Sequence, residues 1–193
     1  MQKPPFHIRR KLRRLFKKDR LEEIGTLLTR FAEDGHLWAL KMLVPAYIGG
    51  MYGLEKDKET AIALLTRIAD TGDADACCLL GLIYTSPGEQ YNPESGAKYY
   101  LLAAQKGHAE AQEGVARCYY RGRGVPQDKE AAVSWFTKSA KQGFLPAQHA
   151  LGVAYLNGEG VAQDRKTAVK WLKKAAAKKH LASISVLESL NDH

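Results

Sequence analysis

The sequence predicts an all-α fold built from helical repeats, and two observations carry that prediction. Residues 143–176 read GFLPAQHALGVAYLNGEGVAQDRKTAVKWLKKAA and repeat the pattern of residues 107–140, GHAEAQEGVARCYYRGRGVPQDKEAAVSWFTKSA. In each copy, apolar residues recur every three or four positions on both sides of a Gly-x-Gly-Val turn, which is the spacing of one helix face. A repeat of this period predicts a helical array, and it indicates a binding scaffold without naming the partner.

Length and composition agree with one continuous array. The chain has 193 residues with 45% hydrophobic content, enough to bury a substantial core. Three cysteines at unrelated repeat positions imply no disulfide framework, so a reducing, cytoplasmic location is expected. The sequence has no apolar run of about 18 residues, the length that would span a membrane. No apolar segment follows the charged N-terminus as it would in a secretory signal.

The positive charge of the chain is concentrated at its beginning. Residues 1–20 contain nine lysines and arginines against Asp19 alone, which gives +8. The formal charge of the whole chain is also +8, so residues 21–193 sum to zero. The high isoelectric point therefore describes one segment and not the repeats.

A short amphipathic helix is predicted within the basic segment, residues 1–19. Over residues 7–18, HIRRKLRRLFKK, one face is apolar (Ile8, Leu12, Leu15 and Phe16) and bases cover the others. Three roles stay open: a cap on the array, recruitment to an anionic membrane surface or to nucleic acid, and an organelle transit peptide. The bases expected to bind an anionic surface are Arg9, Arg10, Lys11, Arg13, Arg14, Lys17 and Lys18.

The repeat region is predicted over residues 20–193. A helix over residues 20–34 comes first, four repeats follow at about 35–71, 72–106, 107–142 and 143–178, and a terminal helix occupies residues 179–190. Each first helix has a small residue four positions after its start: Ala39, Ala76, Ala111, Ala147 and Ser183. Each second helix follows an Asp or Asn, a good N-cap: Asp57, Asn92, Asp128 and Asp164.

The terminal helix has no second helix after it. We expect its apolar stripe to pack on the helix over residues 166–178 and to end the array. The stripe consists of Leu181, Ile184, Leu187 and Leu190. Apolar surface left over on this helix keeps a homodimer open.

The pattern A-x-x-x-L-G-x-x-Y-x-x-G-x-G-V-x-x-D-x-x-x-A-x-x-W-[FL]-x-x-[AS]-A-x-x-G resembles the Sel-one-like repeat, a relative of the tetratricopeptide repeat. The unit from Gly143 matches it most closely, and the resemblance extends over roughly residues 20–190. It implies a right-handed α/α superhelix, a solenoid of antiparallel helix pairs. It also implies an adaptor or scaffold for protein assemblies.

No catalytic, cofactor or metal site is predicted, and an enzyme is disfavoured. The loops at residues 122–124 and 158–160 have a Gly-x-Gly pattern, but the full dinucleotide and P-loop patterns are absent. Their glycines are expected to supply turn residues with positive φ. His36, His108 and His180 stand at helix starts about 10 Å or more apart, so they cannot share a metal ion.

A partner is expected in the groove lined by the first helices of the repeats. By analogy with related repeats, eight exposed positions would contact an unidentified protein or peptide: Lys41, Leu82, Glu113, Arg117, Tyr120, His149, Val153 and Leu156. Among them, Arg117 and Tyr120 are of the residue types that interface hot spots favour. The alternative is an unoccupied groove in which these side chains are solvated or half-packed.

Overall fold

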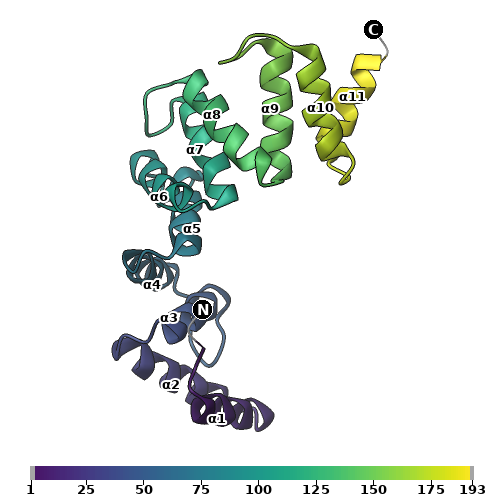
Figure 1. The fold of residues 1–193 in the computed structure, drawn as a ribbon. Coiled ribbons are helices and arrows are strands. Elements are labelled where there is room, and N and C mark those ends of the chain that lie inside the picture. The colour runs from purple at the N-terminus through teal and green to yellow at the C-terminus, as the bar shows by residue number, and fades with distance from the viewer. Residues whose placement is uncertain (1–2, 192–193) are drawn as a thin grey trace. The chain divides into compact units, whose positions relative to one another are not determined.

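The computed structural model describes residues 3–191, which contain helices and no strands. Figure 1 shows the helices in chain order. Eleven helices occur in this range: α1 (Phe6–Lys17), α2 (Leu21–Glu33), α3 (Leu37–Gly49), α4 (Lys58–Asp70), α5 (Ala74–Thr85), α6 (Pro93–Gln105), α7 (Ala109–Arg121), α8 (Lys129–Lys141), α9 (Leu145–Asn157), α10 (Arg165–Ala176) and α11 (Leu181–Asn191). The predicted all-α fold is confirmed. No helix in the described part of the chain is long and apolar enough to cross a bilayer.

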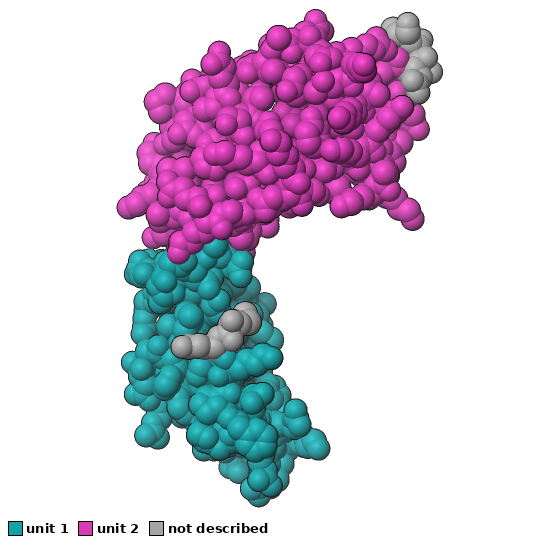
Figure 2. Space-filling view, in the orientation of Figure 1, with its two compact units in different colours: residues 1–76 teal, residues 77–193 magenta. Residues whose placement is uncertain are grey.

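The chain divides into two compact units, residues 1–76 and residues 77–193, which Figure 2 colours separately. The first unit contains α1 to α4 and the beginning of α5, and the second contains the remainder of α5 and α6 to α11. Each helix from α1 to α4 contacts the next, and so does each helix from α6 to α11. Contacts between sequence neighbours are what a linear repeat array requires.

Helix α1 contacts α2 and buries one side of itself. Ile8, Leu12 and Leu15 are buried, whereas Phe16 is 44% exposed and meets the Tyr52 ring edge to face at a centroid distance of 5.6 Å. Three of the four residues in the predicted apolar stripe are therefore buried. All seven bases predicted to bind an anionic surface are exposed.

The same hydrogen bonds recur where the second helix of each repeat begins. The side chains of Asp57, Asn92, Asp128 and Asp164 each accept a backbone N–H three residues later, at 2.8–3.0 Å. The predicted N-caps are thus confirmed. The backbone N–H of each capping residue also donates to the carbonyl of the repeat tyrosine, at 2.9 Å in all four repeats: Tyr47, Tyr84, Tyr119 and Tyr155. These two bonds start every second helix at the same place relative to the first.

Small residues allow neighbouring helices to approach closely. The five predicted small positions are all buried: Ala39, Ala76, Ala111, Ala147 and Ser183. In the second unit, Ala147 and Leu151 of α9 belong to one core cluster with Phe136 and Ala140 of α8. Close packing of this kind places the exposed faces of α7 and α9 side by side, with α8 behind them.

The Gly-x-Gly loops take the left-handed conformation that was predicted. Gly158 and Gly160 have φ angles of 70° and 69°. A Cβ atom on Gly160 would overlap the carbonyl oxygen of Lys129 and lie 2.9 Å from the backbone nitrogen of Glu130, both in the first turn of α8. The loop before α10 therefore lies against the preceding helix pair, and the second glycine permits that approach.

The terminal helix α11 contacts α10, but Leu181 does not lie on the buried side of α11. Leu181 is 79% exposed, whereas Ser183 is fully buried. The prediction that Leu181 packs with the apolar stripe was therefore wrong. Positions 181 and 183 lie about 200° apart around a helix, so the burial of Ser183 directs Leu181 to solvent.

Candidate partner-binding groove

A hollow with a volume of about 420 Å³ lies between α7 and α9 in the second unit. Phe136 of α8 and Ala150, Val153 and Ala154 of α9 form the apolar part of its lining. Polar and charged residues also line it: Glu113, Arg117, Tyr120, Arg121, His149, Glu159 and His180. Apolar surface with a few fixed polar groups is the usual composition of a ligand-binding site. Across residues 3–191, no three His, Cys, Asp or Glu side chains are placed to hold a metal ion.

Glu113 and Arg117 form the first polar group of this hollow. They lie one turn apart on α7, with 3.1 Å between Arg117 Nε and Glu113 Oε1. Burial raises the pKa of the Glu113 carboxyl, and the positive charge of Arg117 opposes that rise. A mostly buried carboxylate depends on its ion-pair partner, so the pair fixes the direction of the Arg117 side chain.

Tyr120, Glu159 and Lys129 form the second polar group. Tyr120 Oη donates a hydrogen bond to Glu159 Oε2, and Lys129 Nζ lies 3.3 Å from Glu159 Oε1. The bond to Glu159 raises the pKa of Tyr120, and the same bond lowers the pKa of Glu159. Lys129 Nζ also lies 5.5 Å from the centre of the Tyr120 ring, within the range of a cation–π contact. Glu159 of the α9–α10 loop is thereby tied to α7 and α8 and bounds one side of the hollow.

Two histidines share the hydroxyl of Ser183. His149 Nδ1 lies 3.1 Å and His180 Nδ1 lies 2.9 Å from Ser183 Oγ, and the two ring centres are 5.2 Å apart. His180 Nδ1 also accepts the backbone N–H of Ser183 at 3.3 Å, so His180 caps the first turn of α11. Burial lowers the pKa of His149, and the nearby charge of His180 lowers it further. The charged form of His149 is therefore disfavoured.

Five of the eight predicted groove residues lie together in this hollow: Glu113, Arg117, Tyr120, His149 and Val153. Leu82 of α5 is 43% exposed and lines a smaller hollow on α5 and α7, together with Arg117. Leu156 is half-buried on α9 and belongs to the lining of neither hollow. The predicted groove positions of α7 and α9 thus contribute to one site, apart from Leu156.

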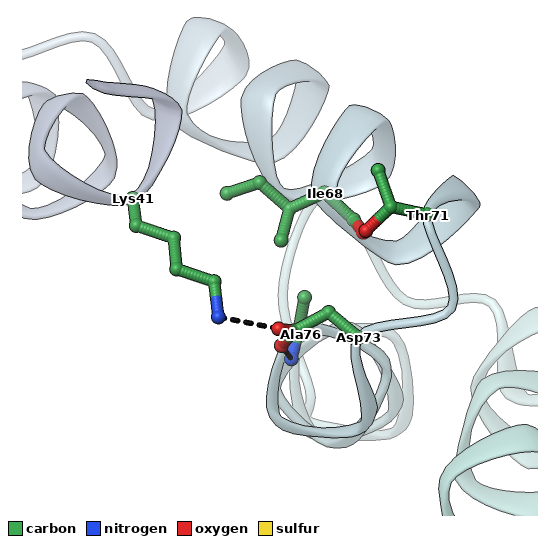
Figure 3. A network of polar contacts seen from close by, with 5 residues as sticks. All are labelled: Lys41, Ile68, Thr71, Asp73 and Ala76. Atoms are coloured by element: carbon green, nitrogen blue, oxygen red, sulfur yellow. Dashed lines mark hydrogen bonds and ion pairs between the residues drawn. The ribbon is translucent and has the colours of Figure 1, made fainter. Parts of the chain in front are cut away.

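Lys41 lies in the first unit, away from this set, and it is held by an internal ion pair. Figure 3 shows the Lys41 side chain reaching from α3 to the carboxylate of Asp73, which precedes α5. Asp73 Oδ1 also accepts the backbone N–H of Ala76 at 3.1 Å. Burial tends to raise the pKa of Asp73, but the bonds from Lys41 and Ala76 outweigh it and the pKa is lowered. The ammonium of Lys41 is thus engaged within its own unit.

Sequence reasoning missed several residues of the hollow. Phe136 repeats the apolar position of Tyr100 and Leu172, and was not singled out among candidate site residues. Glu159 was assigned to a turn, and His180 to a helix start; both assignments are correct, and both side chains also line the hollow. The available signal was that Glu159 differs from Arg123, the residue at the same loop position one repeat earlier.

Comparison with models of protein families identifies the family of this chain. The Sel1 repeat model matches residues 46–73, 74–108, 109–144 and 145–180, which together make up most of the sequence. The chain belongs to the Sel1 repeat family. Sel1 repeat proteins are in general non-enzymatic scaffolds for protein interactions, and they bind protein partners.

Solved Sel1 structures agree with this assignment. The protective antigen c5321 of uropathogenic Escherichia coli is 34% identical, with a TM-score of 0.78 over 84% of this chain. A Sel1 repeat protein from Oxalobacter formigenes is 31% identical, with a TM-score of 0.73 over 88% of this chain. This Sel1 chain covers 35% and 49% of those two structures, so its likeness to them concerns the repeats.

Curated relatives share a shorter segment of the Sel1 array. An F-box protein of Arabidopsis thaliana is 35% identical over 77 residues, 40% of this chain. The DAP3-binding cell death enhancer 1 of Rattus norvegicus is 32% identical over 74 residues, 38% of this chain. The chain spans 22% and 14% of the lengths of these relatives.

Proposed function

We propose that this Sel1 repeat protein is a non-enzymatic scaffold that binds a peptide segment of a partner protein in the hollow between α7 and α9. The observation that carries the proposal is the gathering of non-repeating side chains from successive first helices around an apolar surface. Arg117, Tyr120 and His149 are each held by a hydrogen bond or ion pair, so little side-chain freedom is lost when a partner binds.

The apolar part of the lining would receive one apolar side chain of the peptide. Burying a side chain the size of valine or leucine contributes about 1.5–3 kcal/mol. The polar groups would orient the peptide, because its backbone offers hydrogen-bond donors and acceptors. The name of the rat relative records binding to another protein, DAP3, which supports a protein-binding role for repeats of this kind. The three cysteines are buried, and a reducing, cytoplasmic location stays a prediction from the sequence.

A peptide-display selection against the full chain tests this proposal. Selected peptides are measured by fluorescence anisotropy against wild type and Val153→Arg, which sets a long charged side chain on the apolar lining. The matched control is Val169→Arg, because Val169 is also half-buried but lies on α10. We expect Val153→Arg to weaken binding at least tenfold and Val169→Arg to leave it unchanged. Equal binding to both variants would place the peptide elsewhere.

Recruitment of the protein to an anionic surface through α1 is the weaker candidate function. A membrane-surface helix buries its apolar stripe among lipids, but Ile8, Leu12 and Leu15 are already buried where α1 contacts α2. Attraction to an anionic surface would therefore rest on the exposed bases alone and would weaken with salt. A homodimer through α11 stays a prediction, for which the exposed Leu181 is the one observation.

A further inference from the structure

A second hollow, with a volume of about 190 Å³, lies on α5 and α7 of the same unit. It occupies the equivalent position to the first hollow, one repeat earlier in the array. The lining residues of the two hollows correspond in pairs that are 36 positions apart in the sequence: Tyr100 and Phe136, Gly114 and Ala150, Arg117 and Val153, and Arg123 and Glu159. An extended ligand that follows the first helices would therefore meet both hollows in succession.

The base of the second hollow is set by tight packing around Tyr100. A Cβ atom on Gly81 of α5 or on Gly114 of α7 would lie 2.6 Å or 2.7 Å from the Tyr100 ring. The buried Tyr100 ring therefore lies between these two glycines and joins α5 to α7. This packing fixes the Tyr100 ring as one wall of the second hollow.

The chemistry of the two hollows differs in charge. Both hollows are lined by Arg117 and Arg121, but the second adds Arg123 and no acidic residue, whereas the first adds Glu113 and Glu159. Within residues 3–191, the guanidinium groups of Arg121 and Arg123 form no hydrogen bond or ion pair. The overall charge of the chain does not account for this group, because residues 21–193 sum to zero.

The repeat alignment explains why Arg123 has no internal partner. In the next repeat the same loop position is Glu159, whose charge is bound by Tyr120 and Lys129. The residues that correspond to Tyr120 and Lys129 around Arg123 are Thr85 and Pro93, and neither can neutralise an arginine. The guanidinium of Arg123 is exposed and is therefore accessible to a ligand.

We propose that the second hollow binds an anionic side chain, a phosphate or a carboxylate, of the peptide whose apolar side chain occupies the first hollow. This inference rests on the proposed function and names the chemistry of its ligand. Arginine binds both anions through paired, charge-assisted hydrogen bonds. Neighbouring helices are about 8–10 Å apart and an extended chain rises about 3.3 Å per residue, so the two side chains would be about two to three positions apart in the peptide.

A nucleic acid fits this surface less well than a peptide. A polyanion that reached the three arginines would also cover the first hollow, whose apolar surface offers it no partner and where Arg117 and Lys129 are already paired with Glu113 and Glu159. A peptide with one anionic residue and one apolar residue meets complementary surface in both hollows.

NMR titration of the full chain tests the proposal with single-residue probes. These are N-acetyl-phosphoserine N-methylamide and N-acetyl-glutamate N-methylamide, added at low salt while backbone amide shifts are followed. We expect saturable shifts at Thr85, Ser86, Arg121 and Arg123. Tighter binding of the phosphoserine probe would identify a phosphorylated partner, and similar affinities would identify an acidic one. Both results support the anion site, and absence of saturable shifts from either probe overturns it.

Charge-reversal variants then locate the site. Arg123→Glu reproduces the residue found one repeat later, and we expect it to weaken the better probe at least tenfold. Lys170→Glu is the matched control, because Lys170 is exposed on α10 of the same unit. Arg121→Glu provides a second variant if the first alters the loop. Unchanged affinity in both arginine variants would overturn the proposal. Tighter binding of a dT10 oligonucleotide at the same amides would contradict the assignment to a peptide.

These probes separate failure of this inference from failure of the proposed function. A single residue does not need the first hollow, so saturable probe binding can be observed even if no displayed peptide binds. That combination would refute the peptide scaffold and retain the anion site. Displayed peptides that depend on Val153 but not on Arg121 or Arg123 would support the scaffold and refute the anion site.

Discussion

Replacing each of the two glycines of the α9–α10 loop by alanine should have very different effects on the stability of the chain. Gly158 and Gly160 have nearly equal φ angles, 70° and 69°, so replacement by alanine imposes the same backbone strain, about 1–2 kcal/mol. The loss of conformational freedom in the unfolded chain returns about 0.4–1 kcal/mol at each position. For Gly158 little else changes, because its nearest neighbour, Gln163 Cβ, would be at an ordinary contact distance of 3.4 Å.

Gly160 differs because its added methyl group would meet backbone atoms. The methyl would overlap the carbonyl oxygen of Lys129, which belongs to the first turn of α8 and cannot rotate away as a side chain does. The loop would have to withdraw, which loses its packing on α8 and moves Glu159 away from Tyr120. We expect Gly158→Ala to cost about 1 kcal/mol and Gly160→Ala about 3 kcal/mol or more.

Urea unfolding followed by tryptophan fluorescence measures both variants. Trp135 lies in α8, against which the loop packs, and Trp171 lies in α10, which follows the loop, so both report on this part of the chain. For a chain of this size, 1 kcal/mol corresponds to about 2–4 °C in melting temperature, so thermal scans should separate the variants by about 4 °C or more. Equal losses of stability would refute the reasoning, because they would show that the close approach to α8 has no energetic consequence.

Two further predictions concern the ionisable groups. Because the pKa of His149 is lowered in the folded chain, the unfolded chain binds more protons just below pH 6.5, and the free energy of unfolding should fall as the pH decreases from there. His149→Gln should make this pH dependence weaker in urea titrations at several pH values. An unchanged pH dependence would assign it to another group. Lys41→Met should lower the free energy of unfolding by about 1–3 kcal/mol, because it leaves Asp73 without its cation. It should not change peptide binding, and a loss of peptide affinity in a folded variant would show that Lys41 contributes to the groove.

Features that recur along the sequence could be predicted from it. The capping residues and turn glycines recur at intervals of about 36 residues, and each role follows from local backbone geometry, as Asp164 and Gly160 show. The groove positions on α7 and α9 could be predicted for a related reason, since helix phase decides which side chains face outward. His149 and Val153 therefore line the predicted surface.

Features that depend on contacts between distant residues could not be predicted. Lys41 occupies a groove position by phase, but its charge is bound by Asp73, 32 residues away, in a loop whose path the sequence pattern does not describe. Glu159 lines the hollow because Tyr120, 39 residues earlier, holds it there. Leu181 was placed in an apolar stripe, whereas the cap at His180 and the burial of Ser183 set the phase of α11.

A map of amide shifts on binding of one display-selected peptide tests the central claim most directly. The claim is that the non-repeating faces of α7 and α9 hold an extended peptide across two successive repeats. We expect shifts at Arg117, Tyr120 and Val153, at Glu159 in the loop, and at Arg123 in the neighbouring hollow. Shifts confined to α8 and α10, or to the basic helix α1, would contradict the claim.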